Sequence, residues 1–160
     1  MPTQPSADGV FTTSRLFPFT PAQVFAAFAH PERLGAWWGP DGFSNTFEVF
    51  EFKPQGRWTF VMRGPDGTHY PNDCTFLEAS PQRIVIRHVT APHFTLTITL
   101  TEADGQTRLD WRQAFDDPRV ATAAAPIVVI IVRPVNGLIY HSCAFYSKHI
   151  QPYTIIQYWS

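Results

Sequence analysis

The stretch that decides the fold is "FTPAQVFAAFAHPERLGAWW", residues 19–38, where the apolar residues change from alternation to helical spacing. Thr20 is a predicted N-cap, with Pro21 at the first helical position and Gln23 able to complete a capping box. Pro31 ends this helix and can open a second short one. The stretch therefore predicts two short helices in succession.

On both sides of these helices the chain alternates between apolar and polar residues, as half-buried strands do. The clearest case is "FTLTITLT", residues 94–101, in which four threonines alternate with Phe, Leu, Ile and Leu. Turn sequences such as "GPDG" and "EADGQ" separate the segments. The predicted strands are residues 9–17, 43–52, 57–63, 69–79, 83–89, 94–101 and 107–115. One strand, two helices and a meander of about six strands predict an α+β domain.

Composition limits the classes of function. The chain has 160 residues, enough for one domain with a real core. Charged residues make up 16% and aromatic residues 15%, which favours a heavy aromatic core or a ring-lined apolar cavity. A net charge of −1 argues against nucleic-acid binding. The start is polar without an apolar signal segment, and the longest apolar run, residues 127–132, is too short to span a membrane.

Four quoted segments resemble one family: "PAQVFAAFAHPERLGAWWGPDGF", "GRWTFVMRGPDGTHY", "FLEASPQRIVIRH" and "TLTITLTEADGQTRLDW". They are similar to AHSA-type START-like (SRPBCC) domains, relatives of the domain that activates the ATPase of the 90-kDa heat-shock chaperone. The resemblance covers residues 10–117. It implies a helix-grip fold, in which a curved antiparallel sheet of about six to seven strands wraps around a C-terminal helix and leaves a cavity between them. The family carries no universal catalytic motif.

The candidate ligand-binding residues would line the cavity: all but Trp38 lie on the predicted sheet, and the ring of Trp38 would lie at the cavity mouth. They are mostly apolar and include two polar side chains, as small-molecule sites commonly do. These residues are Trp38, Trp58, Phe60, Met62, Phe76, Ile86, His88, Trp111 and Gln113.

Each polar or aromatic candidate also has a structural explanation. Trp37 and Trp38 can pack the end of the sheet, and a backbone carbonyl can satisfy the ring of His88. Cys74 and Cys143 are expected to be free thiols of a cytoplasmic protein. No catalytic, phosphate-binding or metal-ligand motif occurs, so we expect no cofactor and no metal.

The C-terminal region changes composition. No Asp or Glu follows Asp117, and Pro126, Pro134, Gly137 and Pro152 interrupt the helix that the family resemblance implies there. Either a shortened helix precedes an apolar arm, or the region derives from a shifted reading frame or read-through. We divide the chain into a polar lead (1–8), a START-like domain (9–132) and an atypical apolar tail (133–160).

These observations support three hypotheses of function. The first is the binding of a small apolar or aromatic molecule between the sheet and the C-terminal segment. The second is a chaperone-interacting module that acts through its surface, with homodimer formation as a related alternative. The third is a cyclase-like or hydrolase-like enzyme that uses His88 as a base, although a non-enzymatic role is favoured.

Overall fold

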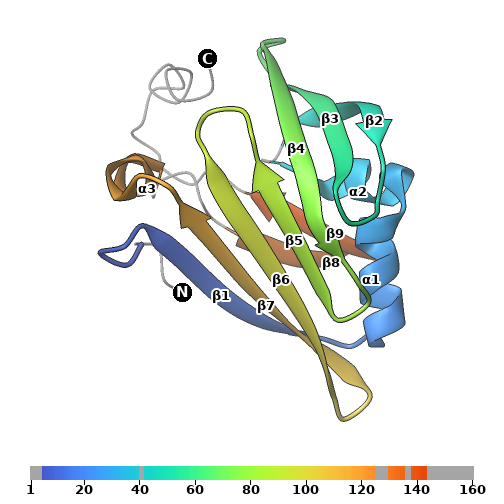
Figure 1. Ribbon diagram of the computed structural model, residues 1–160. Coiled ribbons are helices and arrows are strands. Elements are labelled where there is room, and N and C mark those ends of the chain that lie inside the picture. The colour runs from blue at the N-terminus through green and yellow to red at the C-terminus, as the bar shows by residue number, and fades with distance from the viewer. Residues whose placement is uncertain (1–4, 40–41, 125–129, 136–137, 144–160) are drawn as a thin grey trace.

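The structure is a computed structural model that describes residues 5–39, 42–124, 130–135 and 138–143. Figure 1 shows a large sheet with helices on one side of it. The elements are β1 (Val10–Phe17), α1 (Pro21–Ala29), α2 (Pro31–Trp37), β2 (Ser44–Phe50), β3 (Gly56–Arg63), β4 (His69–Ala79), β5 (Arg83–His88), β6 (Phe94–Ala103), β7 (Gln106–Phe115), α3 (Pro118–Ala124), β8 (Ile130–Val135) and β9 (Leu138–Cys143).

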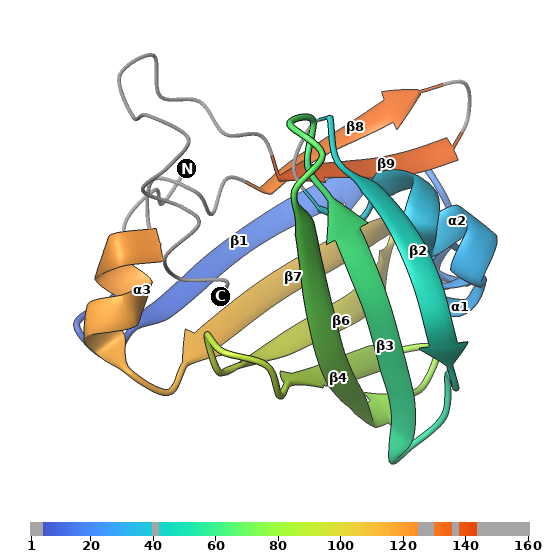
Figure 2. The ribbon, with the colours of Figure 1, turned by 90° about the horizontal axis from the view of Figure 1, so that it is seen from above.

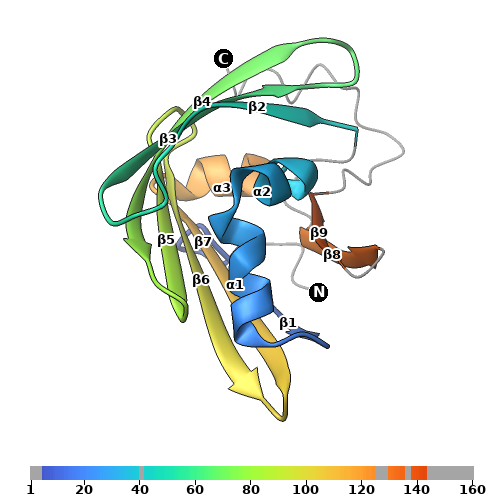
Figure 3. The same cartoon turned by 90° about the vertical axis from the view of Figure 1, so that its right-hand side faces the viewer.

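The main sheet has seven antiparallel strands in the order β1-β7-β6-β5-β4-β3-β2, so β1 and β2 form its edges. It curves around the side on which α1, α2 and α3 lie (Figures 2 and 3). This arrangement confirms the predicted α+β helix-grip fold. The strands β8 and β9 pair only with each other among the described elements, and β9 contacts α1 and α2.

The predicted helix start is confirmed in detail. The Thr20 side-chain oxygen accepts from the Gln23 backbone nitrogen at 3.4 Å, and the Gln23 side chain accepts from the Thr20 backbone nitrogen at 2.9 Å. Two orphan donors of the first turn are thus satisfied by one pair of side chains. Val24 and Phe28 turn inward and are buried, which places α1 against the sheet.

The β6–β7 hairpin is also as the sequence predicts. Its two-residue turn consists of Asp104 and Gly105, with φ angles of 51° and 77°. This left-handed backbone matches the twist of the flanking strands, and Asp-Gly adopts it readily. The turn fixes a register in which Phe94, Leu96, Ile98 and Leu100 are buried on one face.

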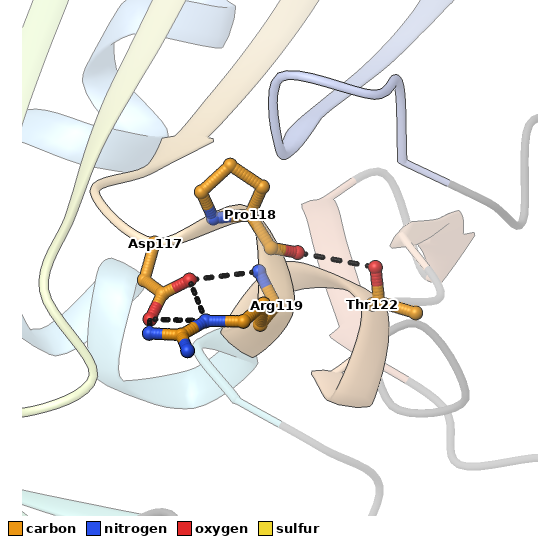
Figure 4. Close-up of polar contacts among 4 residues, drawn as sticks. All are labelled: Asp117, Pro118, Arg119 and Thr122. Atoms are coloured by element: carbon orange, nitrogen blue, oxygen red, sulfur yellow. Dashed lines mark hydrogen bonds and ion pairs between the residues drawn. The ribbon is translucent and has the colours of Figure 1, made fainter.

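The C-terminal helix is short, as expected, and its start is capped locally (Figure 4). The Asp117 carboxylate accepts from the Arg119 backbone nitrogen at 2.9 Å and pairs with the Arg119 guanidinium at 2.8 Å. The helix packs closely on Gly9, where an added Cβ would lie 2.8 Å from the Pro118 Cα. The φ of Gly9 is +75°, so both space and backbone conformation favour glycine there.

Beyond α3, part of the region that the sequence analysis describes as apolar forms the β8–β9 hairpin. The proposed boundary at residue 132 falls inside β8. Residues 125–129, 136–137 and 144–160, which include Pro126 and Pro152, lie outside the described residues. Within the described part of the chain, no helix is long and apolar enough to cross a membrane.

Candidate functional site

Strand register brings the predicted sheet residues to one face, which we call the concave face. In one row across the sheet, Trp58 of β3 pairs with Cys74 of β4, which pairs with His88 of β5. In the next row, Phe76 and Ile86 pair directly and Gln113 follows across β6. Directly opposite residues of neighbouring strands share a face of the sheet. The register of the strands therefore puts all of these residues on one face of the sheet.

Trp58 is the centre of an aromatic cluster. Its side chain is 0% exposed. The ring of Phe60 stacks on it at 4.4 Å between centroids, and Phe76 stacks at 5.6 Å with an interplanar angle of 6°. Phe47 and Phe50 of β2 approach edge-on at 5.4 Å and 6.0 Å. Apolar burial and ring geometry together make this cluster the most aromatic part of the concave face.

Trp38, at the end of α2, contacts both halves of the sheet. Its ring lies 4.9 Å from the ring of Trp58 on β3 and 6.3 Å from the ring of Trp111 on β7. Three strands separate β3 from β7 in the sheet order, so one indole can reach both only because the sheet is curved. Asn45 of β2 holds the backbone of this segment, because its Nδ2 donates to the Trp38 carbonyl at 2.6 Å.

Trp37 has a different role from its neighbour. Its Nε1 donates to the Ala27 carbonyl of α1 at 3.3 Å, and its ring meets Phe28 edge-on at 5.1 Å. This residue joins the two helices. Of the tryptophan pair, Trp38 is the one that contacts the sheet candidates.

The polar atom of this aromatic cluster is the indole nitrogen of Trp58. Nε1 is fully buried and has no hydrogen-bond partner in the described structure. Asn45 Oδ1, on the neighbouring strand, is also buried and without a partner there. Most buried polar groups in native proteins are paired, and an unpaired one costs about 1–3 kcal/mol. An acceptor for Trp58 Nε1 is the group that this part of the site lacks.

His88, by contrast, is held by protein atoms. Nδ1 lies 3.0 Å from the Pro92 carbonyl oxygen, and Nε2 lies 2.9 Å from Asn72 Oδ1. Asn72 in turn donates to the Tyr70 carbonyl at 2.7 Å, and the His88 ring stacks on Phe94 at 4.5 Å. A backbone carbonyl thus contacts the ring, as the structural explanation expects. A neutral imidazole carries one N–H, so the ring donates to one of these two oxygens, and the tautomer decides which.

Burial lowers the pKa of His88, and this effect outweighs the hydrogen bonds with the backbone of Pro92 and Thr90, which raise it. The nearby charges of His93 and Arg87 lower the pKa further. The ring is consequently neutral near pH 7. With both nitrogens facing protein oxygens, the geometry favours a structural role for His88 over that of a general base.

The remaining candidates lie toward the margins of the cluster. Met62 pairs in register with Tyr70 and Asn45, and its sulfur lies close to Gly39, where an added Cβ would be 2.9 Å away. Gln113 is partly buried on β7, opposite Phe11 of β1. The structure thus brings the predicted rings of Trp38, Trp58, Phe60, Phe76 and Trp111 into one connected set.

Sequence analysis missed three polar residues of the concave face: Arg15, Asn45 and Asn72. Asn45 lies in a strand that was predicted without a face being assigned to it, whereas Asn72 is in phase with the candidate Phe76 on the same predicted strand. Arg15 had a usable signal, since it is in phase with the buried Phe11 and Phe17 on β1. Alternation alone could have placed its side chain inward.

The described residues do not favour a metal site or a reactive thiol. No group of three His, Cys, Asp or Glu side chains among them could hold a metal ion. Cys74 is a buried free thiol. Burial, with a smaller contribution from Asp73, raises its pKa, so the thiol stays protonated and unreactive. The side chain of Cys143 lies outside the described residues.

The curved sheet, the two helices after β1 and the short C-terminal helix define a START-like, helix-grip protein. The sequence profile described as "Activator of Hsp90 ATPase homolog 1-like protein" matches residues 18–126. The chain belongs to this family. The matched region ends just after α3, close to where the composition changes.

Solved structures show the same fold. Protein Ms6760 from Mycobacterium smegmatis superposes with a TM-score of 0.67 at 23% identity, over 76% of this chain and 81% of that protein. A protein from Rhodobacter sphaeroides gives 0.68 at 28% identity over the same shares. The Mll3558 protein from Rhizobium loti is 30% identical over 68% of this chain and 80% of its own, with a TM-score of 0.56. No protein with a curated description matches the sequence.

Proposed function

We propose that the protein binds a small apolar or aromatic molecule on the concave face, between the sheet and the C-terminal segment. One observation carries the proposal: a fully buried indole N–H, Trp58 Nε1, has no acceptor in the described structure. The rings around it offer apolar and stacking contacts. A ligand with one acceptor oxygen would supply what the site lacks.

A bound water is the alternative occupant for this position. A buried water usually makes about three hydrogen bonds to polar neighbours. The ring neighbours of Trp58 are Trp38, Phe47, Phe50, Phe60 and Phe76, and their side chains offer almost no acceptors. Such surroundings suit an apolar molecule with a single acceptor better than a water.

A matched pair of probes tests the proposal. 2-Acetylnaphthalene and 2-ethylnaphthalene have nearly the same shape, and only the first carries an acceptor. Titration followed by tryptophan fluorescence should show the ketone binding about 10-fold more tightly to the wild type, which corresponds to one buried hydrogen bond. Trp58→Phe should abolish this preference. Trp37→Phe is the control, because the Trp37 Nε1 already donates to Ala27.

Binding of neither probe up to its solubility limit, together with no apolar molecule retained in native mass spectrometry from the source cells, would reject the proposal. A ketone preference that survives in Trp58→Phe would leave ligand binding intact and remove Trp58 from the site.

The second candidate function is action on a chaperone ATPase through the outer surface, favoured by the description of the family. The chain of ring contacts from Phe60 through Trp58 and Trp38 to Trp111 also suits a filled interior. A stimulated chaperone ATPase rate without any ligand-induced thermal shift would support this candidate. A buried free Cys74 fits the cytoplasmic location that we propose for either function.

A further inference from the structure

Arg15 places a cationic side chain on the concave face. On β1 the buried Phe11 and Phe17 alternate with exposed Thr12, Ser14 and Leu16, and Arg15 is in phase with the phenylalanines. Its direct partner on β7 is Leu109, which is 1% exposed. Opposite residues share a face, so the Arg15 side chain starts from the apolar interior side of the sheet.

Two polar neighbours accompany Arg15 at this edge. Thr13 is directly opposite Trp111, and Gln113 follows Trp111 on the same face of β7. Thr13, Arg15 and Gln113 are each partly buried, whereas Trp111 between them is buried. The β1–β7 edge of the concave face thus combines one guanidinium, one hydroxyl and one amide around an indole. The wall around Trp58 consists of rings.

An inward-pointing charge on an edge strand also hinders edge-to-edge association, and β1 is an edge strand. That role requires a charge but no particular companions. The Thr13 hydroxyl and the Gln113 amide lie beside the guanidinium, within reach of solvent and next to the Trp38 and Trp111 rings. Both groups can donate hydrogen bonds to a carboxylate. The presence of Thr13 and Gln113 beside Arg15 therefore favours recognition of an anion.

We propose that the ligand is a carboxylic acid with an aromatic or apolar body, its carboxylate bound by Arg15 beside Thr13 and Gln113 and its body against Trp111 and Trp38. This inference rests on the proposed ligand-binding function and adds the charge of the ligand. Arginine suits this task because its planar guanidinium binds a carboxylate through two parallel hydrogen bonds and stays charged near apolar surface.

The test compares 2-naphthoate with 2-acetylnaphthalene, which have nearly the same shape; the acid is charged and has a second oxygen where the ketone has a methyl group. Binding is measured by tryptophan fluorescence and isothermal titration at fixed low salt. We expect the acid to bind about 10-fold or more tightly than the ketone to the wild type, as a charge-assisted hydrogen bond predicts. Arg15→Gln should remove the preference and leave ketone affinity unchanged.

Arg112→Gln is the matched control. Arg112 lies on β7 next to Trp111 but is exposed on the opposite face, so this variant changes the net charge equally without touching the concave face. It should retain the preference for the acid. Arg15→Lys keeps the charge without the planar fork and should retain part of the preference. Far-UV circular dichroism and thermal midpoints establish that each variant is folded.

The outcomes separate the two proposals. Equal affinity of the wild type for acid and ketone, or an acid preference that persists in a folded Arg15→Gln, overturns the inference and leaves the ligand-binding proposal standing. Failure of both probes to bind, together with no apolar molecule retained in native mass spectrometry, rejects the ligand-binding proposal itself. If Arg15→Gln does not fold, a folded Arg15→Lys with undiminished acid preference and a wild type indifferent to salt count against the inference.

Discussion

The buried polar groups of the concave face differ in hydrogen bonding between its two walls, one formed by β4 and β5 and the other by β2 and β3. On the β4–β5 wall, His88 and Asn72 are joined to each other and to two backbone carbonyls. On the β2–β3 wall, Trp58 Nε1 and Asn45 Oδ1 have no such partner in the described structure. Both walls are apolar and deeply buried, so burial alone does not distinguish them.

The difference teaches which polar residues support the fold and which are available to a ligand. Side chains that contact one another and the backbone hold each other in place. An unsatisfied buried donor weakens the unliganded protein and strengthens any complex that pairs it. The histidine that stands out in the sequence therefore belongs to the structural wall, and the tryptophan belongs to the binding wall.

The largest effect is expected from truncating the binding wall. Trp58→Ala should lower the free energy of unfolding by about 3–5 kcal/mol, because it leaves a cavity among the surrounding rings. Urea denaturation measures this change. A loss below about 1 kcal/mol would mean that the ring contributes little packing and that the two walls do not differ as described.

The second largest loss of stability is expected from removing the hydrogen bonds of Asn72 on the β4–β5 wall. Asn72→Leu removes the partners of the Tyr70 carbonyl and of His88 Nε2, at a cost of about 2–3 kcal/mol. Thr75→Leu, on the opposite face of the same strand, is the control and should stay within about 0.5 kcal/mol. Equal effects of the two substitutions would contradict the assigned network.

Acid should also lower the free energy of unfolding, through His88 on the β4–β5 wall. The pKa of His88 lies below the ordinary value of 6.5 in the folded protein, so the unfolded chain takes up this proton first as the pH falls. The free energy of unfolding should thus decrease below pH 6.5, by at most about 1.4 kcal/mol per pH unit for one proton.

Unfolding curves between pH 7 and pH 5 measure that slope. His88→Gln should flatten it, whereas His69→Gln, at a solvent-exposed ring on β4, should leave it unchanged. A slope that is the same in all three proteins would show that His88 does not titrate differently on folding.

The smallest effect is expected from removing a donor that has no hydrogen-bond partner in the described structure. Trp58→Phe removes part of a ring and also an unpaired N–H, so the two changes partly cancel and the cost should be about 1 kcal/mol or less. Trp37→Phe removes a hydrogen bond to Ala27 as well and should cost about 1 kcal/mol more. The reverse order in urea denaturation would indicate that Trp58 Nε1 is paired in solution.

Much of the site could be predicted from the sequence, because strand alternation is a local property. It placed Trp58, Phe76, Ile86 and Trp111 on one face, and the register confirms that placement. Alternation does not report which polar atoms find partners. His88 meets Asn72 across β4 and β5, and Pro92 from a loop, and no spacing in the chain encodes those distances.

The C-terminal region shows the same limit. Prolines and glycine predict a shortened grip helix, and in the described part of the chain the helix after β7, α3, has seven residues. Local sequence rules give no reason to expect that residues 130–135 and 138–143 pair as a hairpin, since the apolar run could equally belong to a buried helix segment.

The sequence by itself determined the order of strands and helices from β1 to β7, the capped start of α1, the inward face of β3, β5, β6 and β7, and the family. These follow from local propensity and from periods of two and 3.6 residues. Only the tertiary structure decided that Trp38 contacts both β3 and β7, that both nitrogens of His88 face protein oxygens while Trp58 Nε1 has no partner in the described structure, and that Arg15 and Gln113 share one edge of the concave face. The physical reason is that curvature and strand order bring together residues that are far apart in the chain, and hydrogen bonding depends on those distances.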